Sequence, residues 1–439
     1  MTGHLGAGQQ LGPPRSPWPL VALLYLTGLL AAAQLGKLSA LAPLIAAELQ
    51  LGLPTVALAV SLLEVGGASL GAVAGLLAHR VGLRRSLRFG LGALALGGLG
   101  GALAQGAPGL LGWRLLEAAG YLGVIVSAPV LMVQHCGYPA ADHVPADGSH
   151  PAAIAVGPHT QALALALWST FVPVGLALGA WASAGLAAAA GGGLGWRGAM
   201  VVTGCVAALL WLVVWRAPLP AAAEAPAQPP SGGQPLPGLG PAAWCLALAF
   251  GGFALFAVGL LGLLPSLLVT EGGLSAADAG RWTALASLSA VPGSAAAALL
   301  LRRGGLLRWP MLLSLGLPAL LLFGVFRPAP AVGVAIGLAI AINLLGGVFA
   351  GLAFALLPVL AGSAGSMVRA NGLLAQCGAS GSLLGPPTMA ACVQAAGWPA
   401  AALLGGLVTV LALPLAWRAV TWAASAAERG HGQAGHPLA

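Results

Sequence analysis

Four ionisable side chains stand inside long apolar runs of this 439-residue sequence, namely Lys37, Glu64, Arg114 and Glu117. An ionisable group in a hydrophobic segment costs roughly 2.5–3.5 kcal/mol on insertion scales, so it needs a partner or a function. Buried amines and carboxylates can bind a charged solute or take up and release protons. The formal charges of the four sum to zero, which leaves the sign of a bound solute open.

Composition singles out Lys37 among the four. It is the only lysine in the chain, against sixteen arginines. A desolvated ammonium changes its protonation state readily, whereas a guanidinium does not. We therefore favour Lys37 as a contact for a substrate or a coupled proton. The alternative is a Lys37–Glu64 pair that only fixes helix packing.

Arg114 and Glu117 are three residues apart, so they share one face of a helix. An ion pair that holds the helices together and a role in substrate or proton transfer are both open. The second half of the sequence offers Asn343 and Gln376, which can hydrogen-bond a ligand from the opposite wall of a cavity. Hydrogen bonds between helices are the alternative for both.

The composition shows which class of protein must position these groups. Charged residues make up 6% of the chain, against about 25% in soluble domains. Hydrophobic residues make up 59%, and the mean hydropathy is +0.95. No water-soluble surface can be built from such a chain. The net charge of +8 comes from arginines clustered between apolar runs, not from a basic stripe, which excludes nucleic acid as a partner.

Twelve apolar segments are long enough to cross a bilayer, and only helices satisfy their own backbone polar groups in lipid. We therefore predict an all-α polytopic membrane protein with twelve transmembrane helices. Residues 1–216 are expected to form one six-helix bundle, 217–240 a cytoplasmic linker rich in Pro, Ala and Gly, and 241–439 a second bundle. The predicted segments are 18–45, 54–78, 88–106, 109–133, 161–189, 198–215, 242–268, 279–301, 309–326, 330–356, 369–394 and 398–418.

The positions of the basic residues predict the orientation. With both termini cytoplasmic, twelve arginines fall on the cytoplasmic side of the membrane and three fall outside. This is a clear positive-inside bias. An even number of helices is consistent with both termini on one side.

Short motifs recur in the two halves in the same order, at offsets of 202 to 229 residues. Such a repeat predicts two pseudo-symmetric bundles that rock around a site near the membrane midplane. The paired motifs are Arg80-x-Gly82 with Arg302-x-Gly304, Arg114-Leu-Leu…Pro129-Val-Leu with Asn343-Leu-Leu…Pro358-Val-Leu, and Gly195-Trp196 with Gly397-Trp398.

The loop after the second predicted helix resembles the signature of the major facilitator superfamily, G-x-L-A-D-R-x-G-R/x-R-R. The chain departs from it at His79, where the family usually has an aspartate. Arg114-Leu-Leu-Glu117 similarly resembles a second family motif, R-x-x-E. The resemblance implies that the loop latches the two halves at the cytoplasmic face, with a charge dependence that His79 removes or makes pH-sensitive. The implied gating residues are Gly75, His79, Arg80, Gly82, Arg84 and Arg85.

The same resemblance implies the major facilitator fold and secondary transport by alternating access, without an enzyme activity or a cofactor. We expect a functional monomer in the inner membrane of a bacterium. Gly36-Lys37 and Asn371-Gly372 resemble the branch near the cyanate permeases. The Gly-Pro-x-x-Gly-Gly sequence that drug exporters of the superfamily carry in the fifth helix is absent, which counts against that branch.

Our preferred solute is a small anion, carried with a proton. A proton-driven exporter of drug-like or cationic compounds is the competing function, and a membrane-embedded enzyme or a receptor without transport is the competing class. No H-E-x-x-H, G-x-S-x-G or P-loop sequence is present. Irregularly spaced histidines between 135 and 159 favour a solvated insertion over a metal site.

Prolines and glycines inside the fifth and eleventh predicted helices mark places where moving helices can bend. Proline removes a backbone donor and kinks a helix, and small residues let helices approach closely. Ordinary packing kinks are the alternative. The predicted bending residues are Pro173 and Gly175 in the first half, and Gly385, Pro386 and Pro387 in the second.

Overall fold

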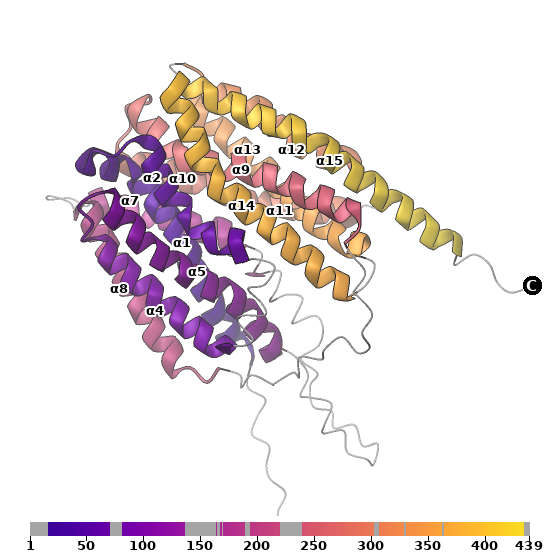
Figure 1. Cartoon of the computed structure of the whole chain (residues 1–439), viewed down its shortest axis with the longest axis horizontal. Coiled ribbons are helices and arrows are strands. Elements are labelled where there is room, and N and C mark those ends of the chain that lie inside the picture. The colour runs from indigo at the N-terminus through magenta and orange to yellow at the C-terminus, as the bar shows by residue number, and fades with distance from the viewer. Residues whose placement is uncertain are drawn as a thin grey trace, which may run out of the picture.

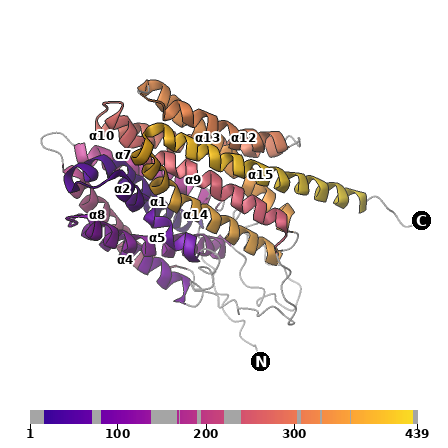
Figure 2. The same ribbon diagram turned by 45° about the horizontal axis from the view of Figure 1, so that its top comes forward.

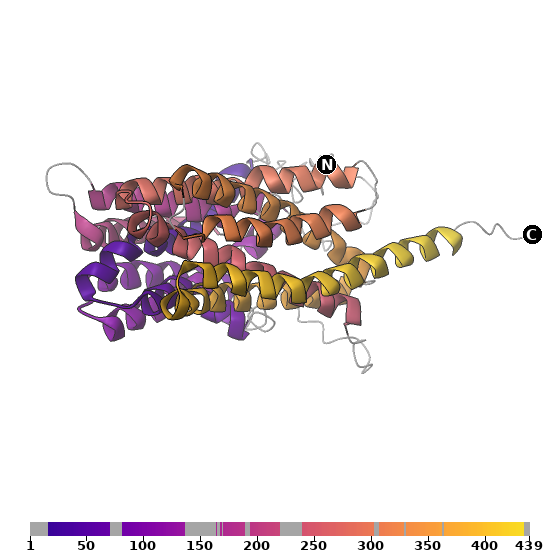
Figure 3. The same ribbon diagram turned by 90° about the horizontal axis from the view of Figure 1, so that it is seen from above.

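The structure is a computed structural model. It describes residues 16–70, 81–136, 164, 167–168, 170–188, 194–219, 239–302, 307–328, 331–361 and 364–433. Every regular element in these residues is a helix, and the long helices lie side by side along one direction (Figures 1 and 3). The predicted all-α fold class is confirmed.

Six helical segments of the first half pack together, coloured indigo to pink in Figure 1. The second of them is interrupted by a short 3-10 turn, η1, and then continues as helix to Leu70. The elements are α1 (Trp18–Leu49), α2 (Leu53–Ser61), η1 (Leu62–Glu64), α4 (Leu83–Gly101), α5 (Ala107–Cys136), α7 (Phe171–Ala188) and α8 (Gly195–Arg216).

The second half contributes six more segments, one of which is divided into α10 and α11 by a turn at Ser289. The last helix, α15, reaches well beyond its neighbours (Figure 2). The elements are α9 (Pro241–Thr270), α10 (Ala276–Leu288), α11 (Ala290–Arg302), α12 (Arg308–Val325), α13 (Val332–Ala361), α14 (Ala364–Ala396) and α15 (Trp398–Gln433).

Twelve helical segments in the described part of the chain thus coincide with the predicted ones. Ten of them are long and apolar enough to cross a membrane on length and composition alone. The other two are α4 and α14, whose glycines and polar side chains lower their hydropathy. Both pack closely against neighbours, α4 against α5 and α14 against α9, so their polar side chains need little contact with lipid.

Most tight turns lie at one end of the molecule, which we call the short-loop face. It is defined by the turns 50–52, 102–106 and 271–275 and by Gly397. The recurring Gly-Trp motif lies here in both halves. Gly195 and Gly397 adopt φ values of 60° and 77°, a left-handed conformation that suits glycine. Gly195 is the first residue of α8, the last helix of the first half, and Gly397 directly precedes α15, the last helix of the second half.

The tryptophan after each of these glycines binds the end of the first helix in its own half. The Trp196 indole Nε1 donates to Glu48 Oε2 at 2.6 Å, and the Trp398 Nε1 donates to Glu271 Oε1 at 3.0 Å. Glu48 lies near the end of α1 and Glu271 directly follows α9. The repeated motif therefore has the same structural role twice.

Close backbone contact between α1 and α7 depends on glycine. A Cβ atom on Gly36 would lie 1.9 Å from the Leu176 oxygen, and one on Gly179 would lie 2.0 Å from the Ala33 oxygen. Gly175 is similar, with a Cβ position 2.6 Å from the Leu29 oxygen. Small residues at this contact let the two helices touch along their backbones.

The predicted bending residues occupy different structural settings. Pro173 is the third residue of α7 and follows a turn at Thr170, so it lies in the first helical turn, where no intrahelical donor is lost. Gly175 serves the contact with α1. Pro386 and Pro387 lie inside the continuous helix α14, beside Gly385, whose Cβ position is 2.0 Å from the Leu255 oxygen of α9. Bending itself stays a prediction.

The two halves meet through α2 with α14, α7 with α10, and α1 with α9 and α10. Within the described residues, four side chains donate hydrogen bonds to backbone oxygens of the other half. They are Ser39 to Leu261, Ser61 to Leu383, Ser287 to Pro173 and Gln376 to Ala68.

Candidate functional site

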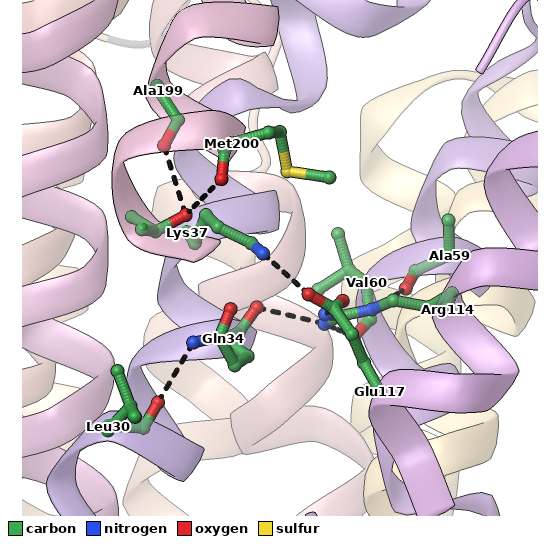
Figure 4. Close-up of polar contacts among 10 residues, drawn as sticks. Leu30, Gln34, Lys37, Ala59, Val60, Arg114, Glu117, Ala199 and Met200 are labelled. Carbon is green, nitrogen blue, oxygen red and sulfur yellow. Dashed lines mark hydrogen bonds and ion pairs between the residues drawn. The ribbon is translucent and has the colours of Figure 1, made fainter. Parts of the chain in front are cut away.

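Lys37, Arg114 and Glu117 form one buried cluster, which we call the ion triad (Figure 4). Glu117 Oε1 accepts from Lys37 Nζ at 2.7 Å, and its Oε2 accepts from Arg114 Nη1 at 2.5 Å. The side chains are 0%, 1% and 1% exposed for Lys37, Arg114 and Glu117 respectively. One carboxylate is therefore shared by two cations from helices α1 and α5.

Arg114 also binds the backbone of two other helices. Its Nε donates to the Ala59 oxygen at 2.8 Å, and its Nη2 donates to the oxygens of Gln34 at 2.9 Å and Val60 at 3.1 Å. Ala59 and Val60 come just before the 3-10 turn η1. A 3-10 turn pairs residues three apart instead of four, which frees carbonyls from the α-helical ladder. Arg114 thus joins α1, α2 and α5 at one point.

The ion triad carries a net charge of +1 and is closed to solutes in this conformation. Each carboxylate oxygen of Glu117 accepts from a cation, and Arg114 donates to this carboxylate and to three backbone oxygens. Charges removed from water are tolerated when they are paired and hydrogen-bonded in this way. A solute could touch Lys37 or Arg114 only after the helices around them move.

Glu64 is placed apart from the triad. It ends η1, is 9% exposed, and its Oε1 accepts from the Tyr121 hydroxyl at 3.1 Å. A Cβ on Gly67 would lie 3.6 Å from Glu64 Oε2 and 2.9 Å from the Cβ of Ala379, so this face of the helix meets α14. Glu64 therefore lies beside the contact between the halves.

The sequence suggested one network of all four ionisable residues, and the structure joins three of them. Lys37 pairs with Glu117 and not with Glu64, its partner in the alternative interpretation of a pair that only fixes helix packing. The hydrogen bond of Glu64 comes from Tyr121, one turn beyond Glu117 on α5. Which of these side chains binds solute or protons stays a prediction.

The two uncharged candidates of the second half behave differently. Gln376 Nε2 donates across to the Ala68 oxygen at 3.0 Å, one turn beyond Glu64. Asn343 is buried, and its Nδ2 donates to the Ala339 oxygen of its own helix at 2.9 Å. Gln376 therefore lies near Glu64 at the contact between halves, and Asn343 is engaged within α13.

Part of the predicted gating loop, with Gly75, His79 and Arg80, lies outside the described residues. Gly82 adopts φ 92° directly before α4, where only glycine is free of strain, and its oxygen accepts from the Ser86 N–H. Arg84 and Arg85 stand in the first turn of α4. The role of the loop as a latch stays a prediction.

Among the described residues, no group of three or more His, Cys, Asp or Glu side chains could hold a metal ion. The five cysteines are free thiols. His143, His150 and His159 lie outside the described residues.

Sequence reasoning missed several residues of the site. Gln34 supplies an oxygen to Arg114, Tyr121 binds Glu64, and Ser39 and Ser61 reach across to the other half. Helical spacing could have pointed to Gln34, three residues before Lys37, and to Tyr121, four after Glu117. The two serines carry no comparable signal.

Comparison with solved structures shows that the chain has a known fold. A bacterial homolog of the human lysosomal transporter Spinster aligns with a TM-score of 0.70 at 15% identity, over 94% of this chain and 98% of that one. A D-xylose–proton symporter aligns with a TM-score of 0.68 at 16% identity, over 91% of this chain and 97% of that one. A nucleoside transporter aligns with a TM-score of 0.65 at 13% identity, over 92% of this chain and 99% of that one.

Sequence comparisons give the family. A search of curated proteins found no match. The profile of the Major Facilitator Superfamily matches residues 149–381, more than half of the chain. The described residues form twelve helical segments, and their fold is shared with these three solved transporters. The chain belongs to the Major Facilitator Superfamily and is a secondary transporter of a small molecule, not an enzyme.

Proposed function

We propose that this transporter carries a small monovalent anion together with a proton, and that Glu64 carries the proton. The observation that supports this is the division of the ionisable groups. In the ion triad both oxygens of Glu117 are already bound by cations and the net charge is +1, whereas Glu64 has a single hydrogen-bond partner among the described residues and lies beside the contact with α14.

The charges couple the two ligands. With Glu64 ionised, the four groups sum to zero and offer an anion no net attraction. Protonation of Glu64 leaves +1, and in a medium of low effective dielectric a single charge acts strongly over several ångströms. Anion and proton therefore favour each other's binding and leave together, which makes the cycle electroneutral.

The short-loop face is proposed to be the external side, with both termini in the cytoplasm of a bacterial cell. The arginine bias supports this orientation. In this conformation α1 and α2 of the first half are joined to α9 and α14 of the second toward the short-loop face. Loading would then take place at the cytoplasmic side, and alternating access requires the external contacts to part.

The first test is thermal denaturation of the purified protein with acetate, nitrate or benzoate, and separately with tetraphenylphosphonium. A ligand at 100 times its dissociation constant stabilises a folded protein by about 2.7 kcal/mol. We expect stabilisation by at least one of the anions, more strongly at acidic pH, and none by the lipophilic cation.

The second test measures coupling in proteoliposomes. An inward gradient of the stabilising anion should acidify the lumen, as followed with a trapped pH dye. Glu64→Gln should reduce this proton movement at least tenfold, whereas Glu48→Gln, at the exposed end of α1, should leave it intact. Anion flux without proton movement in the unaltered protein would overturn the coupling.

The competing function has its own support. Glu64 is a carboxylate beside the contact between the halves, with no other acid bound to it among the described residues, and such a group suits a cationic solute as well as a proton. Stabilisation by tetraphenylphosphonium alone, lost in Glu64→Gln, would identify an exporter of cationic compounds. The solved relatives concern xylose, nucleosides and Spinster, so the cyanate-permease branch has no support from the comparisons.

A further inference from the structure

Two of the hydrogen bonds between the halves have main-chain acceptors of the same kind, each four residues before a proline. Ser39 Oγ of α1 donates to the Leu261 oxygen of α9 at 2.7 Å, and Ser61 Oγ of α2 donates to the Leu383 oxygen of α14 at 2.8 Å. Both serines are buried. Each bond thus links a side chain of the first half to a main-chain oxygen of the second.

Each acceptor is a carbonyl that its own helix cannot use. In an α-helix the oxygen of a residue accepts from the N–H four residues later. That residue is Pro265 for Leu261 and Pro387 for Leu383, and both prolines lie inside their helices. Proline has no N–H, so the two carbonyls are left without their intrahelical donor. An unfilled carbonyl in an apolar interior is costly.

The two bonds lie close together in space. A Cβ atom on Gly262, which follows Leu261, would lie 3.2 Å from Pro386 and 3.8 Å from Val60. Val60 directly precedes Ser61, and Pro386 directly precedes Pro387. One compact region of α2, α9 and α14 therefore holds both vacated acceptors and the donor on α2.

The ion triad fixes the segments that carry both serines. Arg114 binds the oxygens of Ala59 and Val60, immediately before Ser61. Glu117 binds Lys37, two residues before Ser39. A shift of the triad would move both donors relative to the second half.

We propose that Ser39 and Ser61 are closure residues of the transport cycle. Their hydroxyls hold the short-loop face shut by filling the carbonyls that Pro265 and Pro387 vacate, and the ion triad keeps both serines in register. When the face opens, water takes the place of the hydroxyls, which makes the closed state reversible. The proposal does not depend on which solute is carried.

The test measures the distance between the ends of α1 and α9 on the short-loop face. Spin labels are placed at Ala47→Cys and Thr270→Cys after replacement of the five native cysteines, and the full-length protein is studied in lipid nanodiscs by double electron–electron resonance. Ser39→Ala with Ser61→Ala should raise the ratio of long to short distances about tenfold or more, because each change leaves a buried acceptor unfilled in the closed state.

Ser314→Ala is the matched control, since Ser314 is also buried but donates to the Met311 oxygen within its own helix. It should leave the distance distribution unchanged. An unchanged distribution in the double serine variant, or an equal change in the control, would overturn the proposal. Both outcomes can be read without any solute, so failure of the anion–proton function would not produce them.

A second arm tests the prolines. Pro265→Ala restores a backbone donor to the Leu261 oxygen, so the closed state no longer depends on Ser39 for that acceptor. Ser39→Ala should then shift the distance ratio several-fold less than it does when Pro265 is present. Equal shifts in the two backgrounds would show that the vacated carbonyl plays no part.

Discussion

Glu117 accepts from two cations, and this sharing makes it the most constrained side chain of the ion triad. Replacing it leaves Lys37 and Arg114 close together with no counter-charge, in a region where neither side chain can reach water. Breaking a buried ion pair by removing one partner is typically far more harmful than losing the pair as a unit.

Glu117→Gln is therefore expected to lower stability by about 3–5 kcal/mol, which would appear as a large drop in the thermal midpoint in detergent. Adding Lys37→Met should recover a good part of this loss, because the second buried cation is then absent. A Glu117→Gln protein as stable as the unaltered one would contradict the structural account of the triad.

The control at this scale is the exposed pair of Arg281 with Asp278, whose side chains are 60% and 49% exposed. Solvent screens such a pair, and its contribution is about 0–1 kcal/mol. Arg281→Ala should leave the thermal midpoint nearly unchanged, so the comparison separates burial from charge.

At the scale of elements, the contact between α1 and α7 depends on the absence of side chains. Gly36 and Gly179 bring backbone atoms of the two helices into direct contact. The same helix α7 also meets α10 of the other half. The α1–α7 contact therefore positions the helix that adjoins the second half.

Gly179→Val should separate α7 from α1, because its Cβ would lie 2.0 Å from the Ala33 oxygen. Overpacking of this kind costs about 1–3 kcal/mol or more, measurable as a lower thermal midpoint. Gly185→Ala in the same helix has no atom within 4 Å of its Cβ position and should be neutral or slightly stabilising. Equal effects of the two changes would argue against the observed packing.

The helices could be predicted from the sequence because a run of about 20 apolar residues directly reports a membrane span. The repeated Gly-Trp motif could also be found in the sequence, and the structure shows that it has the same role in both halves. The pairing of Lys37 with Glu117 could not be predicted, because Glu64 and Glu117 lie at similar depth and only tertiary packing decides between them. The contacts beside Pro265 and Pro387 could not be predicted either, because a proline in a sequence does not reveal which donor replaces its missing N–H.

At the scale of the whole molecule, the twelve segments and the short-loop face predict a definite topology. Arginines cluster at the other end of the helices, as in the first turn of α4 and the last residues of α8 and α11. By the positive-inside rule this distribution supports our proposal that the short-loop face lies outside the cell.

A cysteine at Leu51 should react with a membrane-impermeant maleimide in intact cells, and one at Ser425 should react only after permeabilisation. Both are introduced after the five native cysteines are replaced. The opposite pattern would invert the proposed orientation and, with it, the side at which the solute is loaded.

The closure contacts also have a consequence for genetic and evolutionary approaches to this transporter. Half of each contact is a main-chain oxygen, so alanine scanning at Leu261 or Leu383 would leave the acceptor in place. Covariation between the serines and the acceptor positions Leu261 and Leu383 would miss it for the same reason. The sequence feature that reveals each acceptor is a proline, Pro265 or Pro387, which lies one helical turn after the accepting carbonyl. In related sequences, the co-occurrence to look for is therefore a serine in one half with a proline four residues beyond its contact in the other.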